Sequence, residues 1–261
     1  MNADPRKPPL VLRVELTADQ TRHILDQTGL SISAIPYEST AAEIRCEFGG
    51  IPLRVPRGVF APAAATERLL HAAIHSASAF ARPTIVDVGT GCGAVALAAG
   101  NALPRARVVG TDVSTRALRA ARANRTRLKL RNVRFARGSL LAPIPRRLNG
   151  RVAVIVANIP YVPPQFGDTV ERTFPEGTAI GQGADGLGLV RELAVGARSF
   201  LESGGSLVLQ LADFQWDSFS VELMDLGYDA PELQPHSLDG PVAARVVWSD
   251  AASRRARAIH A

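Results

Sequence analysis

Apolar residues along this chain form short runs rich in β-branched side chains, separated by stretches that favour helix. The short runs predict strands over residues 84–89, 107–112, 133–139, 152–158, 206–212 and 243–248. The stretches between them predict helices over residues 67–81, 93–101, 114–124, 187–201 and 216–226. We expect a turn at Ser203, Gly204 and Gly205 to close the fourth helix. Strands that alternate with helices predict a doubly wound α/β fold with a mostly parallel sheet.

The first sixty residues have a different pattern. Residues 11–16 are a candidate strand, and a capping box at Thr17 and Gln20 predicts a helix to about residue 27. Residues 42–48 and 51–55 flank a pair of glycines, which predicts a β-hairpin. We therefore expect a small α/β appendage over residues 1–60, the main domain over 61–250, and a basic tail over 251–261.

Composition excludes several classes of protein. No apolar run approaches the roughly 20 residues of a membrane span, and the N-terminus lacks the apolar core of a signal peptide. Cys46 and Cys92 are too few for a disulfide framework or a zinc site, and His71 and His75 lack a third ligand. We therefore expect a cytoplasmic protein that binds neither a membrane nor a metal.

The charge is strongly basic. The formal net charge is +6 and the pI is about 10.1, with the densest basic stretch over residues 116–137. Its first arginines, Arg116, Arg119, Arg122 and Arg125, follow three-residue steps along a predicted helix. A solvated helix face is the simpler interpretation, because abundant arginine, alanine, glycine and proline are typical of a GC-rich genome. A phosphate-binding stripe is the alternative.

Parallel α/β sheets bind ligands beyond the carboxyl ends of their strands, so the strand ends are the candidate site. The first strand runs into residues 87–93, a glycine-rich turn that allows a ligand to approach the backbone closely. The second ends at Asp112, whose carboxylate can accept both ribose hydroxyls of an adenosine. A helix N-cap is the alternative role for Asp112. The turn also fits the relaxed dinucleotide fingerprint, so these two ends indicate a nucleoside-type cofactor without identifying it.

The fourth strand ends in Asn158, Ile159, Pro160 and Tyr161. The Asn158 side-chain oxygen and the Ile159 carbonyl can accept both hydrogens of a planar –NH2 group, and the ring of Tyr161 offers a flat face for it. Such a pair makes a poor nucleophile reactive by polarising the nitrogen and aiming its lone pair. A structural Asn-Pro turn is the alternative interpretation.

Together, these strand ends resemble the class I S-adenosylmethionine-dependent methyltransferases with an (N/D)PPY-type motif. Further stretches are similar to the HemK/PrmC family, the protein glutamine N5-methyltransferases that modify release factors: residues 47–55, 57–67, 87–93, 183–187 and 201–205. The resemblance implies a seven-stranded Rossmann-like sheet. The chain departs from the family in having Ile159 at the second motif position and Gly138, Ser139 and Leu140 where an acidic residue is usual.

The resemblance also implies roles for single residues. Asn158, Ile159, Pro160 and Tyr161 would be catalytic. The implied cofactor-binding residues are Asp87, Gly89, Thr90, Gly91, Cys92, Gly93, Asp112, Val113, Ser139, Leu140 and Asn158. Among them the three glycines would hold the methionine part of the cofactor, Asp87 would lie near its amino group, and Asp112 would take the ribose.

We therefore predict an N-methyltransferase that uses S-adenosylmethionine and acts on a protein glutamine, with a peptide release factor as the implied partner. Three alternatives with the same fold stay open: an adenine N-methyltransferase acting on nucleic acid, an N-methyltransferase for a small amide or amine, and a non-catalytic cofactor-binding protein. An NAD-dependent oxidoreductase would need a proton donor, and the sequence offers no candidate.

Overall fold

A computed structural model describes residues 38–39, 43–167, 174–175, 177–233 and 242–248. Its centre is a seven-stranded sheet with the order β6-β5-β4-β7-β8-β10-β9, and a separate sheet has the order β1-β2-β3. In the central sheet, β6, β5, β4, β7 and β8 are parallel to one another, whereas β10 is antiparallel to both β8 and β9. The predicted doubly wound, mostly parallel sheet is confirmed.

The strands are β1 (Glu38–Ser39), β2 (Glu43–Phe48), β3 (Ile51–Pro56), β4 (Thr84–Val88), β5 (Arg107–Asp112), β6 (Val133–Arg137), β7 (Val152–Ala157), β8 (Leu201–Leu211), β9 (Glu232–Leu233) and β10 (Val242–Val247). The α-helices are α2 (Ala64–Ala77), α3 (Ala94–Ala102), α4 (Thr115–Leu128), α6 (Gly188–Phe200) and α7 (Trp216–Asp225). Short 3-10 turns cover Arg146–Leu148, Pro164–Phe166 and Asp213–Gln215.

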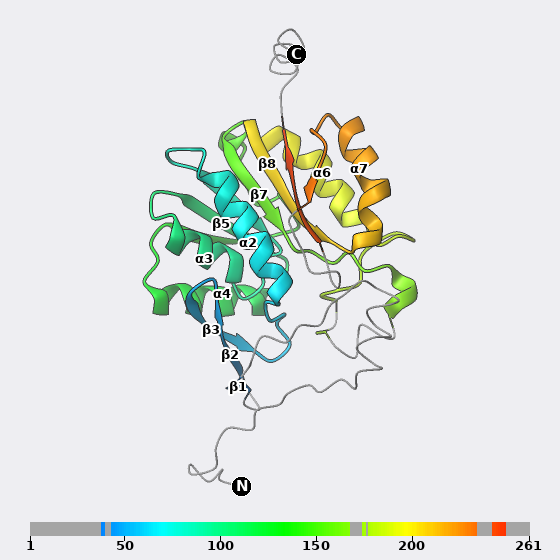
Figure 1. The fold of residues 1–261 in the computed structure, drawn as a ribbon. Helices are drawn as coiled ribbons and strands as arrows, with labels where there is room; N and C mark the ends of the chain where they lie inside the picture. Colours follow the sequence, from blue (N-terminus) through cyan, green and yellow to red (C-terminus); the bar gives the residue numbers. More distant parts are fainter. Residues whose placement is uncertain (1–37, 40–42, 168–173, 176, 234–241, 249–261) are drawn as a thin grey trace, which may run out of the picture.

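Helices cover both faces of the central sheet (Figure 1). One core joins α2, α3, α4 and the β2-β3 hairpin to the sheet, and the other joins α6 and α7 to its opposite face. Strand β7 lies at the centre, and all six of its residues are buried. A strand covered on both faces has no exposed side, which explains why its sequence is an unbroken apolar run rather than an alternating one.

The β2-β3 hairpin packs directly on the helices of the first core. Its side chains alternate between exposed and buried, and Phe48, Leu53 and Val55 point inward. A Cβ atom at Gly49 would lie 2.5 Å from a methyl group of Leu70 on α2, so the turn must approach that helix without a side chain. The hairpin thus shares a core with the main domain. The division at residue 60 stays a prediction.

Most predicted elements agree with the structure, with shifted ends. Helix α2 covers 64–77 rather than 67–81, and α4 extends four residues beyond the predicted residue 124. The turn expected at Ser203–Gly205 was wrong. These residues lie inside β8, which starts at Leu201 and changes register against β7 between Val152 and Val154. Glycines inside a strand often mark a bulge, and here they lie at the change of register. They mark an irregularity within β8 and not a turn.

The strand predicted at residues 11–16, the helix at 17–27 and the tail at 251–261 lie outside the described residues. The two-residue strand β9 was not predicted, because two residues carry no periodicity. Within the described ranges, no helix combines the length and apolarity needed to cross a membrane.

Candidate active site

Four neighbouring strands bring the predicted site residues to one edge of the sheet. In the order β6-β5-β4-β7, the carboxyl end of each strand leads into a segment singled out in the sequence. These segments are residues 138–140 after β6, Asp112 at the end of β5, residues 89–93 after β4, and residues 158–161 after β7. Because parallel strands end on the same side, residues up to seventy positions apart in the chain become neighbours.

The glycine-rich turn packs against residues 158–161 on one side, which we call the acceptor segment, and faces open space on the other. A Cβ atom at Gly89, where φ is 71°, would lie 2.7 Å from the Cγ2 atom of Ile159. At Gly91, where φ is 57°, a Cβ atom would meet only the Gly89 carbonyl oxygen, at 4.0 Å. Gly89 therefore lets the turn pack against the end of β7, and Gly91 leaves the backbone accessible to a ligand.

Asp87 is a buried carboxylate that organises this turn. It is 3% exposed, and its Oδ2 atom accepts hydrogen bonds from the Thr90 hydroxyl (2.6 Å) and the Ala96 amide (3.0 Å). The second bond caps the first turn of α3, which has no cap from the side chain of its own N-cap residue, Gly93. Burial raises the pKa of Asp87 to about 7; the two hydrogen bonds oppose the rise, and the charge of nearby Asp112 adds to it.

This raised pKa predicts a pH dependence of stability in the cofactor-free protein. An aspartate that takes up a proton at higher pH when folded than when unfolded stabilises the fold below its ordinary pKa of 3.8 and loses that contribution as pH rises toward about 7. We expect the free energy of unfolding to fall by up to about 1.4 kcal/mol per pH unit between pH 4 and 7 from this group. Urea titrations of the wild type and Asp87→Asn test this. An identical slope in both proteins would contradict the assignment.

Asp112 ties the second strand end to the glycine-rich turn. Its Oδ2 atom accepts a hydrogen bond from the Gly91 amide (2.9 Å), and its Oδ1 atom accepts one from the Ser114 amide (2.8 Å). The N-cap of α4 is Ser114, whose hydroxyl accepts the Ala117 amide (3.2 Å), so the N-cap interpretation of Asp112 was wrong. Each carboxylate oxygen of Asp112 keeps a lone pair that a ligand hydroxyl can use.

Three further predicted cofactor residues, Val113, Ser139 and Leu140, lie next to the ends of β5 and β6. The Val113 side chain is 62% exposed beside Asp112, and Ser139 is exposed after β6. Leu140 has a φ of 45°, and its carbonyl accepts the Thr111 hydroxyl (2.9 Å), which fixes the turn after β6. This positive φ carries strain for a leucine.

Two other predicted cofactor residues turn their side chains inward. The Thr90 hydroxyl is occupied by Asp87, and the Cys92 side chain is 2% exposed, with burial raising its pKa to about 12. Only backbone atoms of these two residues can contribute to a ligand site. The other cysteine, Cys46, is also buried and unpaired.

Asn158 has an orientation that suits the predicted acceptor role. Its Nδ2 atom points to the Thr66 hydroxyl oxygen on α2 (3.5 Å), which itself accepts the Ala63 amide (3.3 Å). With the nitrogen turned to α2, the Asn158 Oδ1 atom is left as an acceptor. Among the described residues, neither this oxygen nor the Ile159 carbonyl accepts a hydrogen bond.

The Tyr161 ring is buried, although its predicted role would expose one face to a planar substrate group. It is 6% exposed within the core, and burial raises the pKa of its hydroxyl to about 12. The Gln210 Nε2 atom on β8 donates to this hydroxyl at 3.4 Å. The Gln210 Oε1 atom is buried and accepts no hydrogen bond from any residue that the structure describes, an unusual state for an amide oxygen. The role predicted for the Tyr161 ring stays a prediction.

A loop formed by residues 179–187 holds the backbone that follows Asn158. The Val162 amide donates to the Ala179 carbonyl (3.0 Å), and the Gly181 amide donates to the Val162 carbonyl (2.9 Å). A Cβ atom at Gly186 would collide with the Tyr161 carbonyl, so a side chain there would push the two segments apart. The acceptor segment is thus fixed from outside the sheet.

Two side chains lock this loop in place. Gln215 Nε2 donates to the carbonyls of both Tyr161 and Asp185, each at 2.8 Å. Arg191 on α6 pairs with the carboxylates of Asp185 and Glu222, and the hydrogen bonds that Arg191 donates to Asp185 lower the pKa of that carboxyl to about 2. The loop is thereby connected to both α6 and α7.

The sequence interpretation missed the supporting residues Thr66, Gln215 and Asn124. The Nδ2 atom of Asn124, on α4, donates to the Cys92 carbonyl of the glycine-rich turn (3.0 Å). Thr66 and Asp185 lie in stretches that resemble family segments, which was a usable signal. Asn124 and Gln215 lie in helical or turn segments with no motif around them, so only the structure could find them. Among the described residues, no group of three or more histidine, cysteine or acidic side chains could hold a metal.

Comparisons with known proteins match this site. A family model described as a methyltransferase domain matches residues 85–174, which contain β5, β6, β7 and all of β4 except its first residue. A release factor glutamine methyltransferase of Deinococcus radiodurans is 34% identical over 224 residues, covering 85% of this chain and 77% of that protein. The chain belongs to the release factor glutamine methyltransferase family. A second member, from Vibrio cholerae, is 34% identical over 187 residues, covering 70% of this chain and 63% of that protein.

Solved structures support the fold of this family member. A 16S rRNA N2 G1207 methyltransferase of T. thermophilus, solved with AdoMet and guanosine, aligns with a TM-score of 0.56 at 16% sequence identity. The alignment covers 80% of this chain and 50% of that one. At this identity the likeness concerns the Rossmann-like sheet and its helices. The matched part of the chain spans less than two thirds of the length of the V. cholerae relative.

Proposed function

We propose that this protein transfers a methyl group from S-adenosylmethionine to the side-chain amide nitrogen of a glutamine in a peptide release factor. The observation that carries the proposal is the pair of oxygens after β7, Asn158 Oδ1 and the Ile159 carbonyl, which no described residue occupies. The names of the sequence relatives support the substrate class. The protein is thus an enzyme with a protein substrate.

The residues at the strand ends fit S-adenosylmethionine as the methyl donor of the family. Gly91 leaves its backbone open to a ligand, and Asp112 has lone pairs for ribose hydroxyls beside the exposed Val113. Asp87 and Asp112 are the only acidic residues between positions 82 and 150, and both lie at this edge. When bound, the cofactor supplies an electron-poor methyl group on a positively charged sulfur.

The acceptor pair would act by orientation. Asn158 Oδ1 and the Ile159 carbonyl would accept the two hydrogens of the amide –NH2 group, which withdraws the nitrogen lone pair from the amide π-system and aims it. Positioning of this kind can contribute about 7–11 kcal/mol to lowering a barrier. Both oxygens belong to amides and are poor bases, so the extra proton of the product nitrogen would leave to water.

The buried ring of Tyr161 argues against an adenine acceptor. A nucleobase would need a wide aromatic face to lie on, and Tyr161 exposes only 6% of its surface. A glutamine amide is much smaller and needs little more than the two oxygens and the space before them. The small-metabolite alternative uses the same chemistry and differs only in what carries the amide or amine.

A tritium-transfer assay tests the proposal. The full chain with labelled S-adenosylmethionine would be offered, separately, a purified release factor, total RNA and a metabolite extract. We expect label in the release factor, confined to one peptide, and its loss when the glutamine in that peptide is replaced by asparagine. Label in RNA or metabolites with none in the release factor would overturn the substrate and leave the cofactor chemistry standing.

A further inference from the structure

The edge of the sheet opposite the active site carries a row of exposed arginines. Strands β6, β5, β4 and β7 are neighbours and run parallel, so their amino ends lie together. Each begins with or just after an arginine: Arg131 before β6, Arg105 and Arg107 at β5, Arg82 before β4 and Arg151 before β7. All five are exposed. Neighbouring strands lie about 4.8 Å apart, so the row extends over roughly 15 Å.

The surface around this row of arginines is concave. A depression of about 710 Å³ lies among Arg82, Arg105, Arg107, Arg131 and Arg134. Five guanidinium groups around one depression repel each other unless anions lie between them. The depression therefore has the charge and shape of a binding surface for several negative groups.

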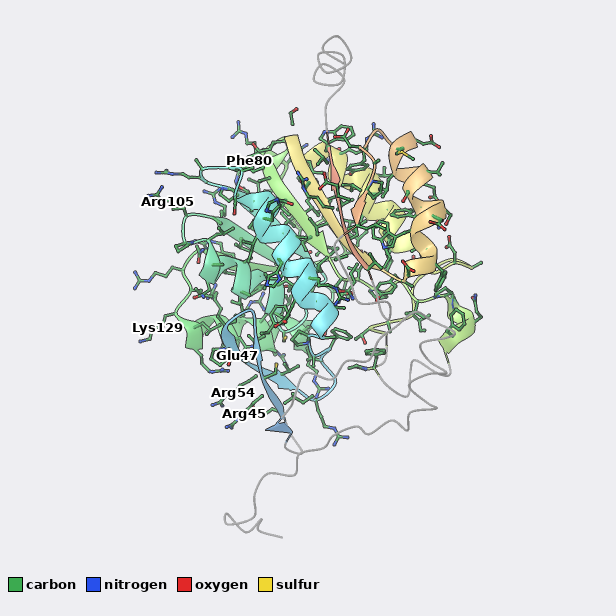
Figure 2. All side chains as sticks on the ribbon, viewed as in Figure 1. Arg45, Glu47, Arg54, Phe80, Arg105 and Lys129 are labelled. Atoms are coloured by element: carbon green, nitrogen blue, oxygen red, sulfur yellow. The ribbon has the colours of Figure 1, made fainter. Side chains whose placement is uncertain are left out.

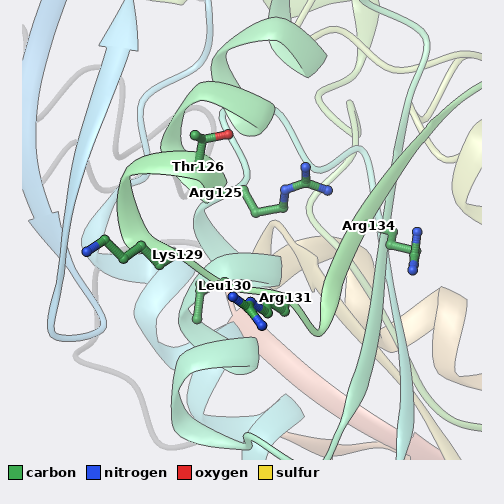
Figure 3. Close-up of a pocket in the computed structure, with 6 residues that line it drawn as sticks. All are labelled: Arg125, Thr126, Lys129, Leu130, Arg131 and Arg134. Atoms are coloured by element: carbon green, nitrogen blue, oxygen red, sulfur yellow. The ribbon is translucent and has the colours of Figure 1, made fainter.

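A second depression continues the first. It measures about 370 Å³, shares Arg131 and Arg134, and adds Arg125 and Lys129 from the end of α4. Figure 3 shows Arg125 pointing toward the strand that carries Arg134, with Lys129 pointing the other way. Figure 2 shows Arg105 and Lys129 projecting from the same side of the molecule. We call the two depressions together the amino-edge surface.

No acidic side chain balances these charges. Within the described residues, none of the arginines or the lysine of the amino-edge surface forms an ion pair. The acidic residues nearest in sequence, Asp87 and Asp112, lie at the opposite ends of their strands. A GC-rich genome explains abundant arginine throughout a chain. It does not explain why acidic residues are missing from one edge and present elsewhere.

The lining indicates which anionic partner fits. Its apolar members are Leu130 and Ala106, of which Ala106 is buried, and no aromatic side chain lines either depression. Amphipathic binding to a membrane and the core of a protein interface both use exposed apolar or aromatic anchors in addition to charge. Arginine instead matches phosphate groups through its planar, forked donors. Without aromatic rings for stacking bases, the surface suits the backbone of a duplex rather than a single strand.

We propose that the amino-edge surface binds the phosphate backbone of double-stranded RNA, independently of sequence, as a docking surface separate from methyl transfer. Duplex RNA is recognised by shape and phosphate contacts, whereas proteins that read DNA sequence in the major groove place a protruding helix or ribbon there. The amino-edge surface is concave and offers no such element. Strands of five or six residues, about 17–20 Å, separate it from Asn158, so the bound duplex is not the methyl acceptor.

The test compares two double variants with the same loss of charge. Arg105→Ser with Arg131→Ser removes two arginines of the amino-edge surface, and Arg116→Ser with Arg119→Ser removes two exposed arginines from the start of α4, at the other end of that helix. Binding of the full chain to a labelled RNA duplex of about 16 base pairs would be followed by anisotropy between about 50 and 200 mM salt. Thermal melting would confirm that both variants fold.

We expect the first pair to raise Kd by about 10-fold or more near physiological salt and to reduce the slope of log K against log salt by about 2, and the control pair to change Kd by less than about threefold. Equal losses in the two pairs would overturn the proposal, because affinity would then follow net charge alone. Tighter binding to a DNA duplex of the same sequence, or arginine-dependent binding to anionic vesicles that displaces the RNA, would also overturn it.

Discussion

Replacing Asn158 with alanine is expected to lower kcat for methyl transfer by about 10²–10³-fold, with little change in the affinity for S-adenosylmethionine. The reason is that one of two acceptors of the amide hydrogens would be lost, and removing one preorganised hydrogen-bonding group from a reacting centre costs about this much. Single-turnover tritium transfer gives the rate, and calorimetry gives the cofactor affinity. Asn149→Ala makes the same change at an exposed position and should leave both unchanged.

Thr66 variants would separate positioning from folding in the same experiment. Thr66→Val removes the hydroxyl that faces the Asn158 Nδ2 atom and keeps the volume, whereas Thr66→Ser keeps the hydroxyl. We expect kcat to fall about 10-fold in the valine variant and to recover in the serine variant, with unchanged cofactor affinity. Full activity of Asn158→Ala would reject the acceptor pair itself, and full activity of Thr66→Val would reject only its orientation by α2.

Replacing Asn124 with leucine is expected to destabilise the protein by about 3 kcal/mol, which corresponds to a fall in Tm of about 6–12 °C. Asn124 is fully buried on α4. Its side chain accepts the Arg54 amide (3.0 Å) and donates to the carbonyls of Arg54 (2.9 Å) and Cys92 (3.0 Å). It therefore pairs the free edge of β3 as a neighbouring strand would, and it also fastens the glycine-rich turn.

Leucine has the same number and branching of side-chain heavy atoms as asparagine and is somewhat bulkier, so the loss would come from the three backbone groups left without partners rather than from a cavity. The matched control is Asn101→Leu at the exposed C-terminal end of α3, which should shift Tm by no more than about 2 °C. Calorimetry measures both variants. Limited proteolysis between residues 43 and 60 would show whether the hairpin detaches first. Equal Tm shifts in the two variants would contradict the proposed role of Asn124.

The sequence by itself determined the order of the elements and which residues stand at the strand ends. Runs such as residues 152–157 can be buried only between two layers of helices, because they expose no polar face. A parallel sheet then forces its strand ends to one edge, so the sequence predicts that Asp112, Asn158 and the glycine-rich turn lie close together. A different signal, two glycines between two apolar runs, predicted the β2-β3 hairpin.

The tertiary structure decided everything that depends on contacts between segments distant in the chain. It turned the Asn158 amide toward Thr66, 92 residues away, and placed Gln215 behind the Tyr161 carbonyl. It buried the Tyr161 ring and gave the second depression of the amino-edge surface arginines from both α4 and β6. Periodicity records only whether a side chain faces inward or outward. The partner it meets there is set by how the layers pack, and local sequence does not contain that information.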